Sequence, residues 1–160
     1  MPGGEHAAAL WTEVAADFRD TARHTGLAEP SARVWRALRA VPRDRFVGER
    51  WQALAWENRP LPIGAGQTIS QPFIVALMTA LAEPEPQHRV LEIGTGCGYQ
   101  AAVLALLAAQ VISIERIASL AELARQHLQA LHVTNVEVHV ADGWQGWPAR
   151  APYDRIVVTA

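Results

Sequence analysis

Three glycines occupy alternate positions, Gly94, Gly96 and Gly98, directly after an apolar run over residues 90–93. Glycine adopts positive φ angles and lets the backbone approach a ligand, because no Cβ stands in the way. Residues 101–109 follow and are rich in strong helix formers. Strand, glycine loop and helix is the order in which a doubly wound sheet builds a nucleotide pocket. The loop therefore predicts a ligand site at the end of the 90–93 strand.

Two carboxylates stand at the ends of the next two predicted strands. Glu115 ends the apolar run 111–115, and Asp142 follows the run 136–140. A carboxylate at the tip of the second strand can accept both hydroxyl hydrogens of a ribose, and one after the third can accept from an exocyclic amine such as that of adenine. Each acid alone is also typical of a turn or a helix start. Their order behind the glycine loop favours a ligand pocket.

The spacing of the loop discriminates between ligands. Dinucleotide sites prefer G-x-G-x-x-G, whereas here the third glycine comes one place early and Glu92 lies two residues before the first. This arrangement resembles the first motif of class I S-adenosylmethionine-dependent methyltransferases. The resemblance implies that Gly94, Thr95 and Gly96 pack against the amino-acid end of that cofactor and that Glu92 helps to place its ammonium. A hydride-transfer enzyme is the competing interpretation, and binding of adenosylmethionine without nicotinamide binding would separate the two.

Composition describes one globular domain. The chain has 160 residues, of which 50% are hydrophobic, and a formal net charge of −2. That length fits one domain, and the near-neutral charge gives no footprint for nucleic acid. The single cysteine, Cys97, excludes a disulfide within the chain, fits a reducing cytoplasm and is interpreted as a small filler in the loop. The N-terminus has no signal-peptide pattern, and no apolar stretch is long enough to span a bilayer, so no membrane partner is expected.

The segments around these motifs predict how they are positioned. Residues 7–25 and 31–40 show helical periodicity and predict an N-terminal helical cap over 1–57 that buries several tryptophans. Residues 58–72 contain prolines and glycines that predict an extended, ordered loop. Ser70 precedes Pro72 and is typical of a helix N-cap, with the helix running to Pro84.

The rest of the chain predicts a mostly parallel sheet. Residues 117–131 form an amphipathic helix pattern, and 155–159 read as a fourth strand. Trp144 and Trp147 lie beside Asp142, where either could flank a purine or pack in the core. We therefore expect an α/β, Rossmann-like, doubly wound fold whose cofactor-binding part covers 73–160. Because a strand left at the end exposes unpaired backbone and apolar surface, we also expect the chain to be a fragment that lacks C-terminal strands.

Several separated stretches resemble one family, the protein-L-isoaspartate O-methyltransferases, in their bacterial form especially. The matching stretches are Ala-Val-Pro-Arg-Asp-Arg-Phe-Val at 40–47, the loop at 61–72, the glycine motif at 90–100, Asp-Gly-Trp-Gln-Gly-Trp at 142–147, and Ala-Pro-Tyr-Asp at 151–154. The Gln-Thr-Ile-Ser sequence at 67–70 is the most specific of them. The resemblance implies the class I methyltransferase fold and transfer of a methyl group from S-adenosylmethionine to the α-carboxylate of L-isoaspartyl residues. It also implies a cytoplasmic, monomeric repair enzyme that acts on isoaspartyl proteins and peptides and needs no metal.

Residue roles carry over onto matching positions. The resemblance makes Ser70 the catalytic residue, and we expect its hydroxyl to orient the acceptor carboxylate. The expected cofactor-binding residues are Gln67, Thr68, Ile69, Glu92, Gly94, Thr95, Gly96, Glu115, Arg116, Asp142 and Gly143. Some relatives carry His after the Ile-Ser-x-Pro motif, where this chain has Phe73, Ile74 and Val75. Two alternatives stay open: a class I methyltransferase with another acceptor, and an inactive cofactor-binding fragment.

Overall fold

The computed structural model describes residues 3–159, and it begins with two helices that form one side of the molecule. The first, α1 (Gly3–Thr25), ends where Gly26 adopts a positive φ of 73° and its amide bonds the Ala22 carbonyl. The second, α2 (Ala32–Ala40), is capped by Ser31, whose hydroxyl accepts from the Val34 amide. Both helices match the predicted cap, and Trp11 packs edge-on against Trp35 in the core between them. Two 3-10 turns, η1 (Arg43–Phe46) and η2 (Glu49–Leu54), follow.

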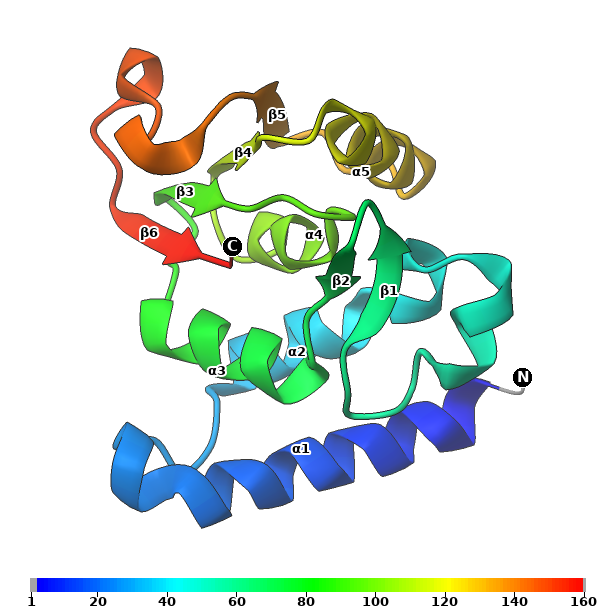
Figure 1. The fold of residues 1–160 in the computed structure, drawn as a ribbon. Coiled ribbons are helices and arrows are strands. Elements are labelled where there is room, and N and C mark those ends of the chain that lie inside the picture. Colours follow the sequence, from blue (N-terminus) through cyan, green and yellow to red (C-terminus); the bar gives the residue numbers. More distant parts are fainter. Residues whose placement is uncertain (1–2, 160) are drawn as a thin grey trace.

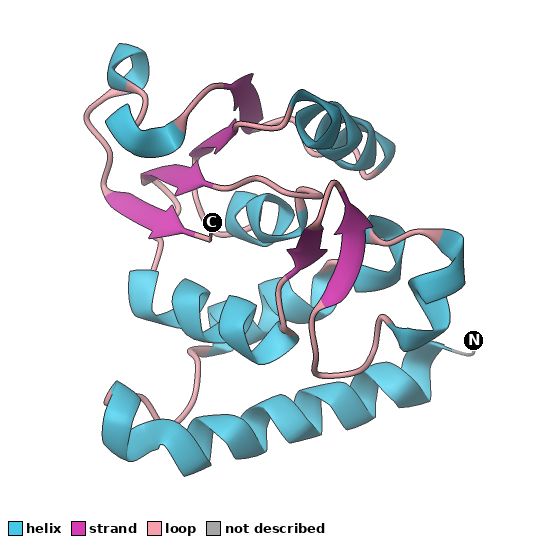
Figure 2. Cartoon of the chain, in the orientation of Figure 1, coloured by secondary structure: helices cyan, strands magenta, loops and turns pink. Residues whose placement is uncertain are grey.

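The segment predicted as an extended loop contains a small hairpin. Strands β1 (Leu61–Gly64) and β2 (Gln67–Ile69) pair antiparallel, as Figure 2 shows in magenta. The turn between them needs positive φ at three successive residues, Gly64, Ala65 and Gly66. Glycine adopts that conformation without strain, which explains its presence on both sides of the turn. Helix α3 (Pro72–Ala82) begins directly after the hairpin.

Four parallel strands form the main sheet. They are β3 (Arg89–Ile93), β4 (Gln110–Glu115), β5 (Val136–Val140) and β6 (Arg155–Val158), in the order β5-β4-β3-β6. Helices α4 (Tyr99–Ala105) and α5 (Ala118–Ala130) connect the first three strands, and the turns η3 (Gly143–Gln145) and η4 (Pro148–Arg150) precede the last. In Figure 1 the arrowheads of β3 and β6 point toward the side of the molecule that carries the hairpin. The predicted α/β fold and its strands are confirmed.

The two faces of the sheet are covered differently. On one face, Val90, Val111 and Val157 pack with Leu104 of α4 and Met78 of α3. On the other, Leu91, Ile112 and Ile114 are covered by Trp147 and Tyr153 from the segment that joins β5 to β6. Ile156 and Val158 of β6 remain 60% and 58% exposed, and β6 pairs with β3 alone within residues 3–159. The apolar surface expected beside the last strand is therefore present.

No described helix combines the length and the apolar character that crossing a bilayer requires.

Candidate active site

A cavity of about 640 Å³ lies at the carboxyl ends of the parallel strands, beside the hairpin. Its walls come from four separated stretches: the end of the hairpin, the glycine loop, the end of β4, and the turn after β5. The predicted site residues on its walls are Gln67, Thr68, Ile69, Ser70, Gly94, Thr95, Gly96, Glu115, Arg116, Asp142 and Gly143. Glu92 is the predicted residue that does not line it. A volume of this size suits a ligand as large as a nucleoside with a side chain.

The glycine loop is held open by the strand beside it. The amides of Gly94 and Thr95 both donate to the Ile114 carbonyl, at 2.8 and 3.2 Å. All three glycines have positive φ, and at Gly98 a Cβ would lie 3.2 Å from the Cβ of Ala124 on α5. The third glycine thus lets the loop pack closely on α5, while the first two line the cavity.

Glu115 ties the loop to the end of β4. Its side chain is buried, and its two carboxylate oxygens accept from the Gly96 amide at 2.8 Å and the Ile117 amide at 2.9 Å. Each carboxylate oxygen can accept more than one hydrogen bond, so both retain capacity toward the cavity that Glu115 lines. The residue is placed to accept hydroxyl hydrogens from a ligand and to fix the loop at the same time.

Glu92 lies below the loop, on the helix-covered face of the sheet. It is fully buried and accepts from the Ser113 hydroxyl, which also bonds the hydroxyl of Thr95. Burial raises the pKa of Glu92 from 4.5 to about 8, so the carboxyl group is mostly protonated at pH 7. Its other oxygen has no hydrogen-bond partner within residues 3–159. Glu92 is therefore connected to the cavity-lining Thr95 by a chain of two hydrogen bonds through Ser113. The sequence did not predict this connection.

Ser70 does not cap α3, contrary to the local prediction. The cap residue is Gln71, and the side-chain bond to the first turn comes from Asn58, whose amide oxygen accepts from the Phe73 amide at 3.0 Å. The Asn58 amide nitrogen also donates to Asp17 on α1 at 2.7 Å. Asn58, which lies 15 positions before Phe73, thus takes the capping role, and within residues 3–159 the Ser70 hydroxyl makes no hydrogen bond. The hydroxyl is free to contact a ligand in the cavity.

The far end of the cavity is formed by the turn after β5. Asp142 caps η3 by accepting from the Trp144 amide at 3.0 Å. Gly143 packs so closely on β3 that a Cβ there would lie 2.4 Å from Cγ2 of Ile93. Of the two tryptophans left open by the sequence, Trp144 lines the cavity and is 92% exposed, whereas Trp147 packs on the sheet. Trp144 is the aromatic that could flank a purine.

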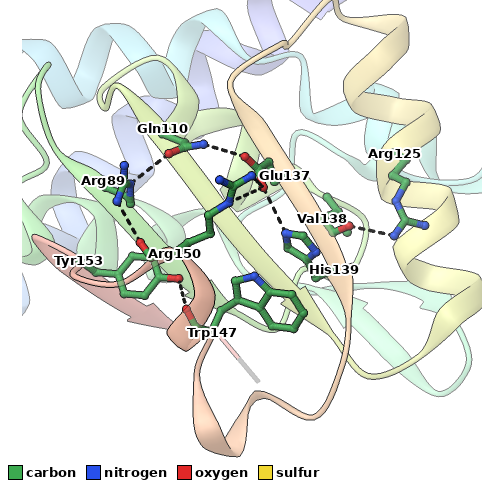
Figure 3. Close-up of polar contacts among 9 residues, drawn as sticks. All are labelled: Arg89, Gln110, Arg125, Glu137, Val138, His139, Trp147, Arg150 and Tyr153. Atoms are coloured by element: carbon green, nitrogen blue, oxygen red, sulfur yellow. Dashed lines mark hydrogen bonds and ion pairs between the residues drawn. The ribbon is translucent and has the colours of Figure 1, made fainter.

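A polar network fixes this turn to the sheet (Figure 3). The Tyr153 hydroxyl donates to the Trp147 carbonyl at 2.6 Å, and the Trp147 ring stacks on His139 with centroids 4.3 Å apart. Arg150 pairs with Glu137 of β5 at 3.1 Å, which anchors η4. Because these contacts come from β5 and the segment before β6, they hold the Asp142 turn over the strand ends.

Cys97 also lines the cavity but is only 3% exposed, and burial raises the pKa of its thiol to about 12. A thiol with so high a pKa is a poor nucleophile at neutral pH, which supports its interpretation as a filler. Within residues 3–159, no group of three or more His, Cys, Asp or Glu side chains is arranged to hold a metal ion.

The fold and this cavity define a protein of the class I methyltransferase type. The chain is similar to a solved "protein-L-isoaspartate O-methyltransferase" with 28% identity and a TM-score of 0.78, over 93% of this chain and 47% of that one. It is also similar in fold to a putative protein-L-isoaspartate O-methyltransferase from Plasmodium falciparum, solved in complex with S-adenosyl-L-homocysteine, with 20% identity, a TM-score of 0.71 and coverage of 91% and 72%.

The model of the family "Protein-L-isoaspartate(D-aspartate) O-methyltransferase" matches residues 17–160. The chain belongs to this family. It spans about half the length of the first solved relative, which it covers to 47%.

Proposed function

We propose that the cavity binds S-adenosylmethionine and that the protein transfers its methyl group to the α-carboxylate of L-isoaspartyl residues in proteins and peptides. Family membership supports the reaction, and the lining of the cavity supports the cofactor. Glu115 would accept the ribose hydroxyls, Asp142 the adenine amine, and the loop from Gly94 to Gly96 would cradle the amino-acid end. Gln67, Thr68, Ile69, Arg116 and Gly143 complete the lining.

The cofactor fits the residues present. Glu115 offers a buried carboxylate with free acceptor capacity at the strand end, and Trp144 offers an exposed aromatic face beside Asp142. When bound, S-adenosylmethionine supplies an electrophilic methyl group on a positively charged sulfur. The protein's part is to hold an acceptor in line with that group and to exclude water, so positioning carries most of the catalytic effect.

The reaction needs no general base. An α-carboxylate has a pKa near 3.5 and is ionised at pH 7, so it is already nucleophilic. The Ser70 hydroxyl can donate a hydrogen bond to one carboxylate oxygen and leave the other free to attack. In agreement, no histidine is among the residues within 3–159 that line the cavity.

One observation carries the proposal. Ser70, whose hydroxyl has no hydrogen-bond partner in residues 3–159, lines the same cavity as the glycine loop and Glu115. A serine that capped α3 would have been explained by helix stability alone. With Asn58 in that role, a free hydroxyl at the cavity wall is best explained by contact with an acceptor.

Calorimetric titration tests the cofactor half of the proposal. The chain should bind S-adenosylhomocysteine and show no heat with NAD⁺; the reverse result would favour the hydride-transfer interpretation. Incubation with labelled S-adenosylmethionine and an aged protein rich in isoaspartyl residues tests the reaction. Label should enter as a base-labile ester, whereas base-stable label would favour another acceptor group. A monomeric state and a cytoplasmic location stay predictions.

A further inference from the structure

The candidate site depends on a residue that does not line it, the fully buried Arg43 of η1. Its guanidinium donates three hydrogen bonds, all to backbone carbonyls. One Nη reaches the Ala55 carbonyl at 2.8 Å, and the other reaches the carbonyls of Arg59 at 3.1 Å and Ser70 at 2.9 Å. Arg59 and Ser70 stand at the two ends of the segment that contains the β1–β2 hairpin. One nitrogen therefore fastens both ends of the hairpin segment.

The guanidinium also lies behind the wall of the cavity. It contacts Ser70 through the carbonyl, and its central carbon is 5.9 Å from the ring centroid of Tyr99. Both residues line the cavity. Arg43 therefore lies directly behind the part of the cavity wall that Ser70 and Tyr99 form.

The charge of Arg43 is not neutralised locally. Within residues 3–159, no carboxylate oxygen lies within 4.0 Å of its guanidinium, and its Nε has no hydrogen-bond partner. The neighbouring Asp44 does not pair with it. Burying a charge without a counter-ion costs free energy, and the three carbonyl hydrogen bonds offset that cost only in part. Arginine keeps its proton even when buried, so the positive charge persists.

We infer that Arg43 is the positioning residue for the acceptor end of the cavity. It fastens both ends of the hairpin that carries Ser70, and its uncompensated charge favours an anionic acceptor beside the Ser70 hydroxyl. This inference rests on the proposed function for the identity of the acceptor, but the hairpin attachment is independent of it.

The test compares Arg43→Lys and Arg43→Gln with a control substitution at Arg33, an exposed arginine that also bonds backbone carbonyls. One Nη of Arg33 likewise bridges two carbonyls, those of Pro84 at 3.2 Å and Leu107 at 3.1 Å, neither of which belongs to a cavity-lining residue. Arg43→Lys keeps the charge, but its single ammonium nitrogen cannot take the positions of both Nη atoms, which reach different carbonyls. Amide exchange over residues 59–70 should accelerate roughly tenfold in Arg43→Lys and stay unchanged in Arg33→Lys. Equal exchange in the two variants would overturn the inference whether or not the chain is active.

Kinetics with an isoaspartyl peptide supplies the second readout. Arg43→Lys should lower kcat about tenfold or more while the Kd of S-adenosylhomocysteine stays within about twofold, because a displaced Ser70 affects turnover and not cofactor binding. The charge-free Arg43→Gln should in addition raise KM for the peptide, and equal KM values in the two variants would overturn the electrostatic role. If the wild type shows no isoaspartyl transfer, the proposed function fails while the exchange comparison still decides the attachment.

A measurement on the wild type covers the case in which the Arg43 variants do not fold. The Nη hydrogens of Arg43 should give separate NMR signals that exchange slowly with water, since three carbonyls hold them. Signals that average like those of surface arginines would contradict the attachment.

Discussion

Ser70 lines the cavity and its hydroxyl has no hydrogen-bond partner in the described residues, so removal of the hydroxyl should affect chemistry more than folding. We predict that Ser70→Ala lowers kcat for an isoaspartyl peptide on the order of 100-fold, as expected when one preorganised donor to a reacting group is lost. Steady-state kinetics and calorimetry with S-adenosylhomocysteine check this. The Kd should stay within about twofold; a parallel loss of turnover and cofactor affinity would contradict the orienting role.

We propose that Glu115 both fixes the glycine loop and binds the cofactor, and two substitutions separate these functions. Glu115→Ala leaves the Gly96 and Ile117 amides without their acceptor, so we expect a loss of about 1–3 kcal/mol in unfolding free energy together with weaker S-adenosylhomocysteine binding. Glu115→Gln keeps an acceptor for one amide but removes the charge. The unfolding free energy of the Gln variant from chemical denaturation and its Kd for S-adenosylhomocysteine from calorimetry should both lie between those of the wild type and the Ala variant. Unchanged cofactor affinity in both variants would remove Glu115 from the binding site.

Glu92 should make stability depend on pH. Its pKa is about 8 in the folded chain and near 4.5 when exposed, so well below pH 4.5 both states are protonated and the group adds no pH dependence to stability. As the pH rises from about 4.5 to 8, the unfolded chain ionises first, and stability falls by an amount on the order of several kcal/mol. Glu92→Gln cannot ionise and should flatten that decline. Denaturation midpoints at pH 5 and pH 8 test this, and identical slopes in the two proteins would contradict a buried neutral Glu92.

At the scale of elements, the turn after β5 contains Gly143, which has no room for a side chain. Gly143→Ala would bring a Cβ against Ile93, so we predict a loss of about 1–3 kcal/mol in unfolding free energy and weaker S-adenosylhomocysteine binding through displacement of Asp142. Gly48→Ala is a matched control, since its φ of −63° suits alanine and nothing lies within 4 Å of the added carbon. Thermal unfolding and calorimetry compare the stability and the S-adenosylhomocysteine affinity of the two variants. Equal values would show that the turn accommodates the added carbon and would contradict the prediction.

The regular elements were predictable from local patterns, and the small ones were not. The runs that became β3 and β4 are apolar because both faces of a parallel sheet are covered, and that signal is strong in sequence. The β1–β2 hairpin is missed because its strands of four and three residues include Pro62 and flank glycines, features that locally favour a loop. The cap of α3 is mispredicted because Asn58, fixed by Asp17 on α1, replaces the nearby Ser70.

For the whole molecule, the motifs identify what lines the cavity but not how it is supported. The glycine loop, Glu115 and Asp142 meet because the carboxyl ends of parallel strands share one edge of the sheet, which topology alone implies. The burial of Glu92 beneath Thr95, the division between Trp144 and Trp147, and the attachment of the hairpin by Arg43 depend on packing between distant segments. No local pattern encodes such contacts.

We propose that the protein methylates isoaspartyl carboxylates at this cavity. The reaction is tested most directly with labelled S-adenosylmethionine and two peptides that are identical except for isoaspartate or aspartate at one position. Both carry ionised carboxylates, so only placement of the acceptor beside Ser70 distinguishes them. We predict base-labile label on the isoaspartyl peptide alone. Equal labelling of both peptides, or label on neither while S-adenosylhomocysteine binds, would contradict it.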